Sequence, residues 1–237
     1  MRIRTFNAGW WFWVLLTLIV MTGVTVYGRR LDLSDRQKLV LNLSILELII
    51  MRIYKIFILR NRPGNSYFNN LPCYLCNQST LLCIAAAATG NNSLMCYCIV
   101  VGTTGSLLAY LIPDAFNKDQ PFFSMQALGF YGYHGLLIIT CLSFALLALY
   151  HPDLMDAFWN MVILFVCACI AHIFNFVLRK TGLEPTSNYV YTYDHEDTPV
   201  FKPLYRLFPV KLFYMVPILP FTGLLSLIVI LIMKAFG

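Results

Sequence analysis

Seven long runs of apolar residues, separated by short polar segments, organise the sequence from one end to the other. A helix rises about 1.5 Å per residue, so about 20 apolar residues are needed to cross the core of a bilayer. Each run is about that long, and the pattern therefore predicts seven membrane-spanning helices. Their ranges are Trp10–Tyr27, Gln37–Leu59, Leu71–Gly90, Ser93–Ile112, Tyr131–Tyr150, Ala157–Leu178 and Lys211–Phe236.

The segments between the runs carry the residues that usually end helices. Asn61–Asn65 contains a proline and a glycine, and His151-Pro152-Asp153 ends the fifth run. Pro217 and Pro220 lie in the last run and predict a kink there. The sequence contains no internal repeat and no linker, so we expect one seven-helix domain over residues 1–237.

Composition supports a membrane protein rather than a soluble one. Apolar residues make up 59% of the chain and charged residues 12%, and a soluble domain of this size cannot bury so much apolar surface. The fold class expected is an all-α polytopic bundle. The net charge of +6 comes from basic residues between the runs, which indicates topology and no nucleic-acid partner. Membrane lipids are the expected environment and substrates, and the oligomeric state is open.

The distribution of basic residues predicts an orientation. Eleven of the 17 lysines and arginines lie at the N-terminus or after the second, fourth and sixth helices, and five lie on the other side. Because loops rich in basic residues remain on the cytoplasmic side, the N-terminus is expected in the cytoplasm and the C-terminus outside. The membrane is expected to be the cell membrane if the protein is bacterial. The first run is too long and too aromatic for a cleaved signal peptide, so it is expected to remain as a helix.

Two cysteines at the start of the third run, Cys73 and Cys76, have the spacing of a redox or metal pair. Zinc needs two further ligands, and no second close pair of cysteines or histidines lies on that side. We therefore expect no metal and no cofactor.

We expect each ionisable residue inside a span to have a structural or functional role, because placing it near the bilayer centre costs roughly 2.5–3.5 kcal/mol. They are Glu47 and Arg52 in the second run, His134 in the fifth and His172 in the sixth. Five residues separate Glu47 from Arg52, so the two face different directions. We expect a polar partner for Glu47 on another helix.

The third run opens with Leu71-Pro72-Cys73. Proline is favoured at the first helical position, which would place Cys73 in the first turn, where the positive end of the helix dipole favours a thiolate. Cys73, Cys76, Asn77 and Thr80 share one helical face. The alternative is that they are ordinary helix-packing residues.

His134 lies between glycines that would allow close approach of another helix or a ligand. The third and fifth helices enter from the same side, so His134 and Cys73 lie at similar depth. His172, Asn175 and Arg179 follow helical spacing, and their helix ends on that side too. The polar groups are therefore expected to converge toward one side of the bundle.

The order of these motifs resembles a known family. Leu71-Pro72-Cys73, the pair His134-Gly135, and Asn175 followed by Asn188-Tyr189 resemble the YwaF-like bacterial integral membrane proteins. These in turn resemble the eukaryotic transmembrane acyltransferase that makes ether phospholipids, and more distantly the androgen-induced-gene membrane hydrolases of fatty-acid esters. The similarity covers about half of the chain, and Tyr74 stands where the family usually has histidine.

The resemblance implies a lipid acyltransferase or transacylase with Cys73 as nucleophile and His134 as its partner. Asn77, or the backbone N–H groups at the start of the third helix, is expected to stabilise the oxyanion. His172 or Glu47 is expected to orient His134. Asn175 is a further supporting residue. Arg60, Arg62, Arg179 and Lys180 suit a lipid phosphate. The alternative is a non-enzymatic transporter or lipid-binding bundle that uses the same polar groups as a pathway.

Overall fold

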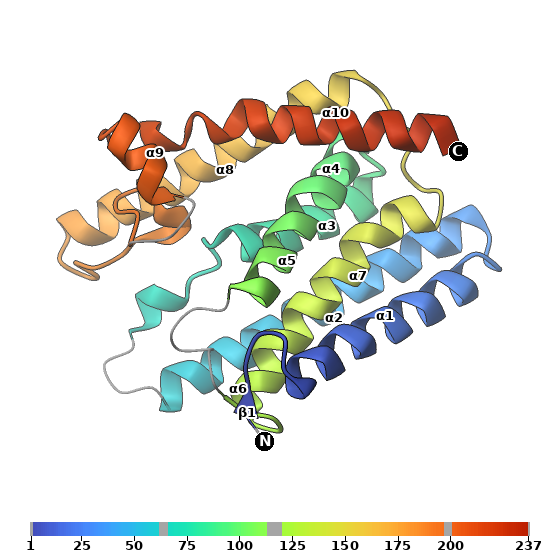
Figure 1. Cartoon of the computed structure of the whole chain (residues 1–237), viewed down its shortest axis with the longest axis horizontal. Helices are drawn as coiled ribbons and strands as arrows, with labels where there is room; N and C mark the ends of the chain where they lie inside the picture. The colour runs from blue at the N-terminus through green and yellow to red at the C-terminus, as the bar shows by residue number, and fades with distance from the viewer. Residues whose placement is uncertain (1, 62–65, 113–119, 197–200, 237) are drawn as a thin grey trace.

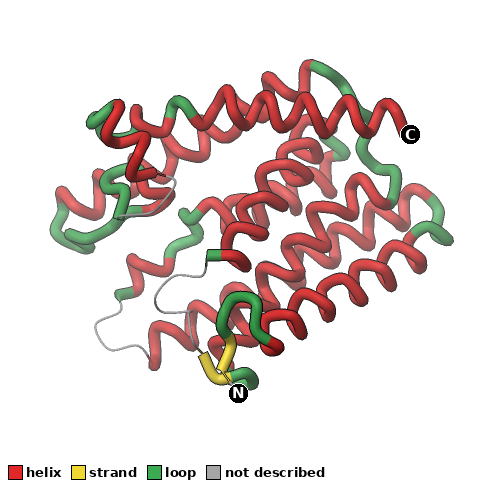
Figure 2. Tube along the Cα trace, in the orientation of Figure 1, coloured by secondary structure: helices red, strands yellow, loops and turns green. Residues whose placement is uncertain are grey.

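The computed structural model describes residues 2–61, 66–112, 120–196 and 201–236, and most of them lie in helices (Figures 1 and 2). The elements are β1 (Arg2–Ile3), α1 (Ala8–Gly28), α2 (Leu33–Asn61), η1 (Tyr67–Asn70), α3 (Leu75–Thr89), α4 (Asn92–Tyr97), η2 (Cys98–Gly102), α5 (Thr103–Leu111), β2 (Gln120–Pro121), α6 (Met125–Ala127), η3 (Leu128–Gly132), α7 (Tyr133–Leu146), α8 (Met155–Lys180), η4 (Tyr189–Tyr191), α9 (Phe201–Leu207), η5 (Phe213–Met215) and α10 (Ile218–Phe236). The segments η2 and η3 are π-helical turns within longer helices, and η1, η4 and η5 are 3₁₀ turns.

The helices form two groups. In the larger group α7 contacts α1, α2 and α5, and α2 contacts α3. In the smaller group α8 and α10 pack against each other along the top of Figure 1. The groups are joined by the continuous rod α4–η2–α5, because α4 contacts α8 and η2 contacts α10. This rod is therefore the part of the chain that both groups share.

The largest core cluster lies where α3, the α4–η2–α5 rod and α7 meet. Tyr97, Leu137 and Phe144 are among its fully buried side chains. The outward faces of the peripheral helices are apolar as well, and Ile19 of α1 and Phe221 of α10 are both more than half exposed. Apolar faces of this kind are suited to lipid rather than to water.

Within the described residues, five helices are long and apolar enough to cross a membrane. They are Ala8–Gly28, Asn92–Leu111, Met125–Leu146, Met155–Lys180 and Phe213–Ala235. The protein is thus an all-α, multi-pass membrane protein. Five of the seven expected spans thus correspond to candidate spans in the structure, and the number seven is not confirmed. α3 is apolar but has only 15 residues, and α2 has 29 residues but a lower mean hydropathy and an exposed Arg52.

The boundaries of most predicted helices agree with the structure to within a few residues, with two corrections. The fifth helix begins at Met125 rather than Tyr131, because the Ser124 hydroxyl accepts a hydrogen bond from the Ala127 amide at 3.0 Å and caps it. The predicted kink at the prolines of the last run is wrong. Pro217 precedes α10 and Pro220 lies in its first turn, where the backbone N–H needs no helical partner.

The first residues are tied to the middle of the chain. β1 pairs antiparallel with β2, and the indole N–H of Trp10 donates to the Tyr110 carbonyl at 2.8 Å. The Asn7 side chain caps α1 by accepting from the Trp10 amide at 3.0 Å. The N-terminal segment, the end of α5 and the start of α6 therefore lie at one end of the molecule (Figure 1).

Candidate functional site

Cys73 lies in the turn before α3, outside the helix. α3 begins at Leu75, and Tyr74 takes the N-cap position with an extended backbone. The prediction that Pro72 opens the helix and puts Cys73 in its first turn is therefore wrong. The Tyr74 ring contacts the Tyr189 ring edge-on at 4.8 Å and lies under the Lys55 ammonium at 4.8 Å, and these contacts hold it outside the helix.

The Cys73 side chain is buried among apolar groups from the far end of the chain. It is 5% exposed and belongs to a cluster with Ala171 of α8, Val190 of η4 and Met215 of η5. Burial disfavours the charged thiolate and raises the pKa of Cys73 to about 11. Because Cys73 lies outside α3, the helix dipole does not stabilise its thiolate as expected. This thiol is protonated at neutral pH and needs a base to act as a nucleophile.

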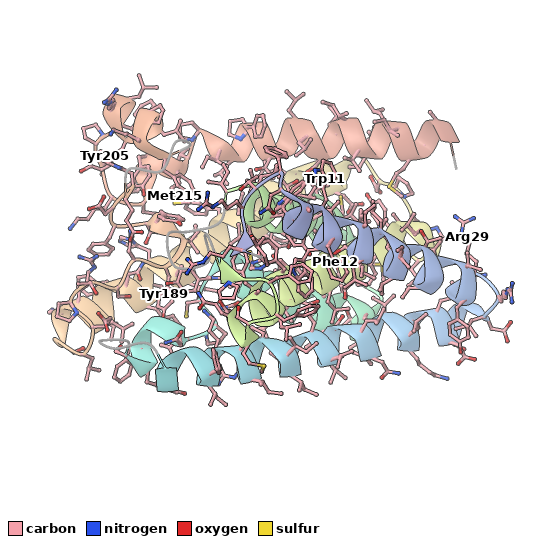
Figure 3. The ribbon with its side chains drawn as sticks, turned by 60° about the horizontal axis from the view of Figure 1, so that its bottom comes forward. Trp11, Phe12, Arg29, Tyr189, Tyr205 and Met215 are labelled. Carbon is pink, nitrogen blue, oxygen red and sulfur yellow. The ribbon has the colours of Figure 1, made fainter. Side chains whose placement is uncertain are left out.

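Two polar side chains fix the turn that holds Cys73. The Gln78 amide donates to the Cys73 carbonyl at 2.9 Å and to the Cys167 carbonyl of α8 at 3.3 Å. The Tyr189 hydroxyl accepts from the Leu71 amide at 3.1 Å and donates to the Phe68 carbonyl. Tyr189 and Met215 lie toward the same end of the molecule as Tyr205, away from Arg29 (Figure 3).

A chain of polar groups crosses from α2 through α3 to α7. The Thr80 hydroxyl donates to the fully buried Glu47 carboxylate and lies 2.9 Å from the Tyr133 hydroxyl. Tyr133 in turn donates to the Asn77 side-chain oxygen at 3.2 Å. The expected partner for Glu47 on another helix is thus confirmed, and Glu47 and Asn77 belong to one network. Arg52 is exposed, so it faces away from Glu47 as predicted.

The Asn77 amide nitrogen has no hydrogen-bond acceptor among the described residues, although it is buried. A buried amide that lacks an acceptor is costly, and such a group is suited to a ligand oxygen. The helix that carries Asn77 is also the helix that follows Cys73. This amide is therefore a candidate donor near the predicted nucleophile.

His134 follows Tyr133 at the start of α7 and is 8% exposed. Its Nδ1 atom lies 2.7 Å from the Phe130 carbonyl oxygen, which can only accept. The neutral ring therefore carries its hydrogen on Nδ1, and Nε2 keeps a lone pair. The Phe130 carbonyl, rather than Glu47 or His172, orients this ring in the structure.

The space around the two glycines beside His134 differs. A Cβ added at Gly135 would lie 2.6 Å from both the Thr17 hydroxyl of α1 and the Tyr110 hydroxyl of α5, whereas one at Gly132 would meet nothing within 4 Å. The expected close approach of another helix is thus found at Gly135 alone.

His172 and Asn175 of α8 hold the segment that follows their helix. His172 Nδ1 lies 3.2 Å from the Thr192 hydroxyl, and its ring stacks on Tyr193 at 4.9 Å. The Asn175 side chain donates to the Tyr189 carbonyl at 2.9 Å and accepts from the Tyr189 amide at 2.8 Å. Asn175 therefore fixes Tyr189, the residue that ties down the turn of Cys73.

The four predicted headgroup-binding cations differ in their surroundings. The Arg179 guanidinium donates to the Ser187 carbonyl at 2.5 Å and lies 4.7 Å from the centre of the Tyr193 ring. Lys180 is exposed, with its ammonium 5.5 Å from the centre of the Phe176 ring. Arg62 and the side chain of Arg60 lie outside the described residues.

The predicted catalytic pair is not hydrogen-bonded. Cys73 belongs to the cluster of α8, η4 and η5, whereas the His134 ring contacts Phe130 and Tyr133. The hydrogen bond from Tyr133 to Asn77 is what joins the two neighbourhoods. Within the described ranges no three histidine, cysteine or acidic side chains have the geometry to hold a metal ion.

Comparison with models of protein families shows to which family this chain belongs. The model of the TMEM164 family matches residues 5–233, nearly the whole sequence. The chain belongs to the TMEM164 family. This TMEM164 family match is consistent with the eukaryotic, acyltransferase-related branch of the resemblance and does not confirm a bacterial YwaF-like assignment. Comparisons with curated proteins and with solved structures found no match.

Several residues that connect the parts of this candidate site are not indicated by the sequence. Tyr133, Gln78 and Tyr189 are all buried and connect the segments around Cys73, Asn77 and His134. A tyrosine next to His134 and a glutamine five residues after Cys73 were the available signals. Tyr189 was noted only as part of a motif, because its partners are about 120 residues away.

Proposed function

We propose that this protein is a membrane-embedded acyltransferase that moves an acyl chain between lipids, with Cys73 as nucleophile and His134 as its base. The observation that supports it most is the position of Cys73. In a TMEM164 family membrane protein, a buried thiol lies in the turn before α3, among residues that also line an apolar cavity. A thiol beside such a cavity is placed to meet the ester of a lipid.

The first step would form a thioester. His134 Nε2 takes the thiol proton as the Cys73 sulfur attacks the ester carbonyl of a phospholipid. The tetrahedral intermediate then collapses, the carbon–oxygen bond breaks, and the imidazolium returns the proton to the leaving lysolipid alkoxide. The Phe130 carbonyl stabilises the imidazolium, because it already accepts from Nδ1.

The second step reverses the roles. A hydroxyl of an acceptor lysolipid gives its proton to His134 and attacks the thioester, and the Cys73 thiolate leaves and is reprotonated. The same step with water would hydrolyse the donor lipid. The unused donors of the Asn77 amide would stabilise the oxyanion in both steps.

The missing hydrogen bond between Cys73 and His134 is compatible with this mechanism, since catalytic hydrogen bonds are often long before substrate binds. Of the two predicted cations whose side chains the structure describes, Lys180 is the more open to a lipid phosphate, because Arg179 already binds backbone carbonyls. We therefore assign Arg179 mainly to holding the segment after α8 and Lys180 to the headgroup.

Turnover of site variants tests the proposal. With a phospholipid donor and a lysolipid acceptor in nanodiscs, Cys73→Ser and His134→Ala should each lower transfer by about 100-fold or more. Cys76→Ser is the matched control, because Cys76 is a half-buried cysteine of α3 itself, and its effect should be milder. Full turnover by Cys73→Ser on every lipid that the wild type processes would exclude this mechanism.

The rival function is a transporter or lipid-binding bundle. The buried chain from Glu47 through Thr80 and Tyr133 to Asn77 is the observation that favours it, since buried polar chains also form substrate pathways. Lipid or solute movement in liposomes that survives Cys73→Ser but is lost in Glu47→Leu would support the rival.

A further inference from the structure

A cavity with a volume of about 500 Å³ lies between the two groups of helices. α5, α8, α9 and α10 supply most of its walls, and nearly all of the lining side chains are apolar. Cavities of this size bind small molecules or parts of larger ones. Since the surrounding helices include three of the five candidate spans, the cavity is placed to receive a hydrophobic ligand from the bilayer.

The cavity runs along the helices that line it. Ile218, Thr222 and Leu225 line it from successive turns of α10, which corresponds to about 10 Å along the helix axis. Leu164 and Ala168 line it from successive turns of α8. A space that extends about 10 Å between apolar helices can hold part of an extended hydrocarbon chain.

One end of the cavity reaches the neighbourhood of Cys73. Leu75, Val190 and Met215 line the cavity and also pack in the cluster that contains Cys73. At this end α9 presents two kinds of side chain. Phe201, Pro203 and Leu204 line the cavity, whereas the same short helix carries Lys202 and Arg206.

We propose that this cavity binds one acyl chain of a glycerophospholipid, with the ester near Cys73 and the chain end between α5 and α10. The proposal rests on the acyl transfer proposed above. The cations of α9 complement the phosphate of the headgroup, and the apolar walls take the chain. The residues that line the deep part of the cavity then select the length of the transferred chain.

Gly105 of α5 offers a way to test this without disturbing the packing. It lines the cavity, and a Cβ added to it would meet no other atom within 4 Å. Leucine at this position therefore extends into the cavity, and it also suits a helix better than glycine does. Gly23 of α1 is the matched control, because it is also helical and also has nothing within 4 Å.

The first experiment measures chain-length preference. Wild type, Gly105→Leu and Gly23→Leu are each given an equimolar mixture of phospholipid donors whose acyl chains increase in length. Gly105→Leu should shift the preferred chain by several carbons toward shorter chains, and Gly23→Leu should keep the wild-type preference. An unchanged preference in a folded Gly105→Leu protein would overturn the proposal, and Gly105→Ala provides a smaller step if leucine impairs folding.

The second experiment does not need turnover. A phosphatidylcholine that carries a diazirine near the end of one acyl chain is photolysed with the Cys73→Ser protein in nanodiscs. The label should map to α5 and α10 and fall at least several-fold in Gly105→Leu. Labelling of the cavity without any acyl transfer by the wild type would refute the proposed function and keep this binding site. Labelling confined to the outer faces of α1 and α8 would refute the site itself.

Discussion

The thiol of Cys73 is almost completely shielded from water by α8, η4 and η5. The pKa of Cys73 is raised above its ordinary value near 9.0, so the folded protein favours the protonated thiol. The corresponding contribution to stability is fully present below pH 9 and is lost as pH rises toward about 11. Reactivity has the opposite trend, because the thiolate is the nucleophile.

This predicts the pH profile of alkylation at Cys73. The rate, measured by mass spectrometry of the Cys73 peptide after iodoacetamide treatment, should keep rising between pH 9 and about pH 11 in the folded protein. The same peptide in the denatured chain should level off near the ordinary value of 9.0. A folded-state profile that levels off at or below pH 9 would show that the thiol is activated rather than suppressed.

The two glycines beside His134 make a second prediction at single residues. Gly135→Ala should destabilise the protein by about 1–3 kcal/mol, because the new methyl group meets Thr17 and Tyr110. Gly132→Ala should be neutral or stabilising by up to about 1 kcal/mol, because this helical position is open. Thermal unfolding in detergent compares them, and equal midpoints would contradict the packing at Gly135.

At the scale of elements, the segment between α8 and α9 depends on Asn175. Besides its two bonds to Tyr189, Asn175 donates to the Thr192 hydroxyl at 2.8 Å and accepts from the Ser187 hydroxyl at 2.7 Å. Removing the amide takes a hydrogen-bond partner from each of these four groups. The Tyr189 carbonyl still accepts from the Thr192 amide, and the Thr192 hydroxyl still lies beside His172. The turn of Cys73 depends on Asn175 indirectly, through Tyr189.

We therefore expect Asn175→Leu to loosen this segment while α8 itself persists. The cost should be roughly 2–4 kcal/mol, with amide exchange around Tyr189 faster by about 10-fold or more. Hydrogen–deuterium exchange with mass spectrometry measures this, and Lys180→Ala on the same helix is the control. Unchanged protection of residues 187–192 would show that other contacts hold the segment.

The apolar runs were sufficient to predict where most helices lie, because a span is defined by length and apolar content alone. The exceptions have local causes. Tyr74 stays outside α3 because Tyr189 and Lys55 contact its ring, and neither contact is visible from the local sequence. Pro217 and Pro220 begin α10 instead of bending it, because the preceding residues form η5.

At the scale of the whole molecule, the prediction of a site at one end of the bundle depended only on helix alternation. Which residues pack against Cys73 could not be predicted from helix alternation. Cys73 packs with residues more than 100 positions away, and most of the cavity wall comes from α5, α8, α9 and α10, which all follow residue 102. The sequence thus indicated Cys73 and His134 as candidates, and it could not show that Tyr133 and Asn77 connect their surroundings.

The orientation of the bundle is a prediction for the whole chain. With seven spans, the N-terminus and the segment around residues 182–192 should lie on the cytoplasmic side, and the C-terminus on the other side. Single cysteines placed at Thr186 and Lys234 in a background without reactive cysteines should be labelled by an impermeant maleimide from opposite sides of sealed vesicles. Labelling of both from the same side would contradict the seven-span arrangement.

The most direct test of acyl transfer by Cys73 is to isolate the acyl-enzyme. The purified protein is incubated with a phospholipid that carries an alkyne-tagged acyl chain, without acceptor, and the tagged peptide is identified by mass spectrometry. We predict a hydroxylamine-sensitive thioester on Cys73 that is absent in Cys73→Ser and strongly reduced in His134→Ala. A thioester on Cys76 instead, or acyl transfer by the wild type with no thioester on Cys73, would contradict it.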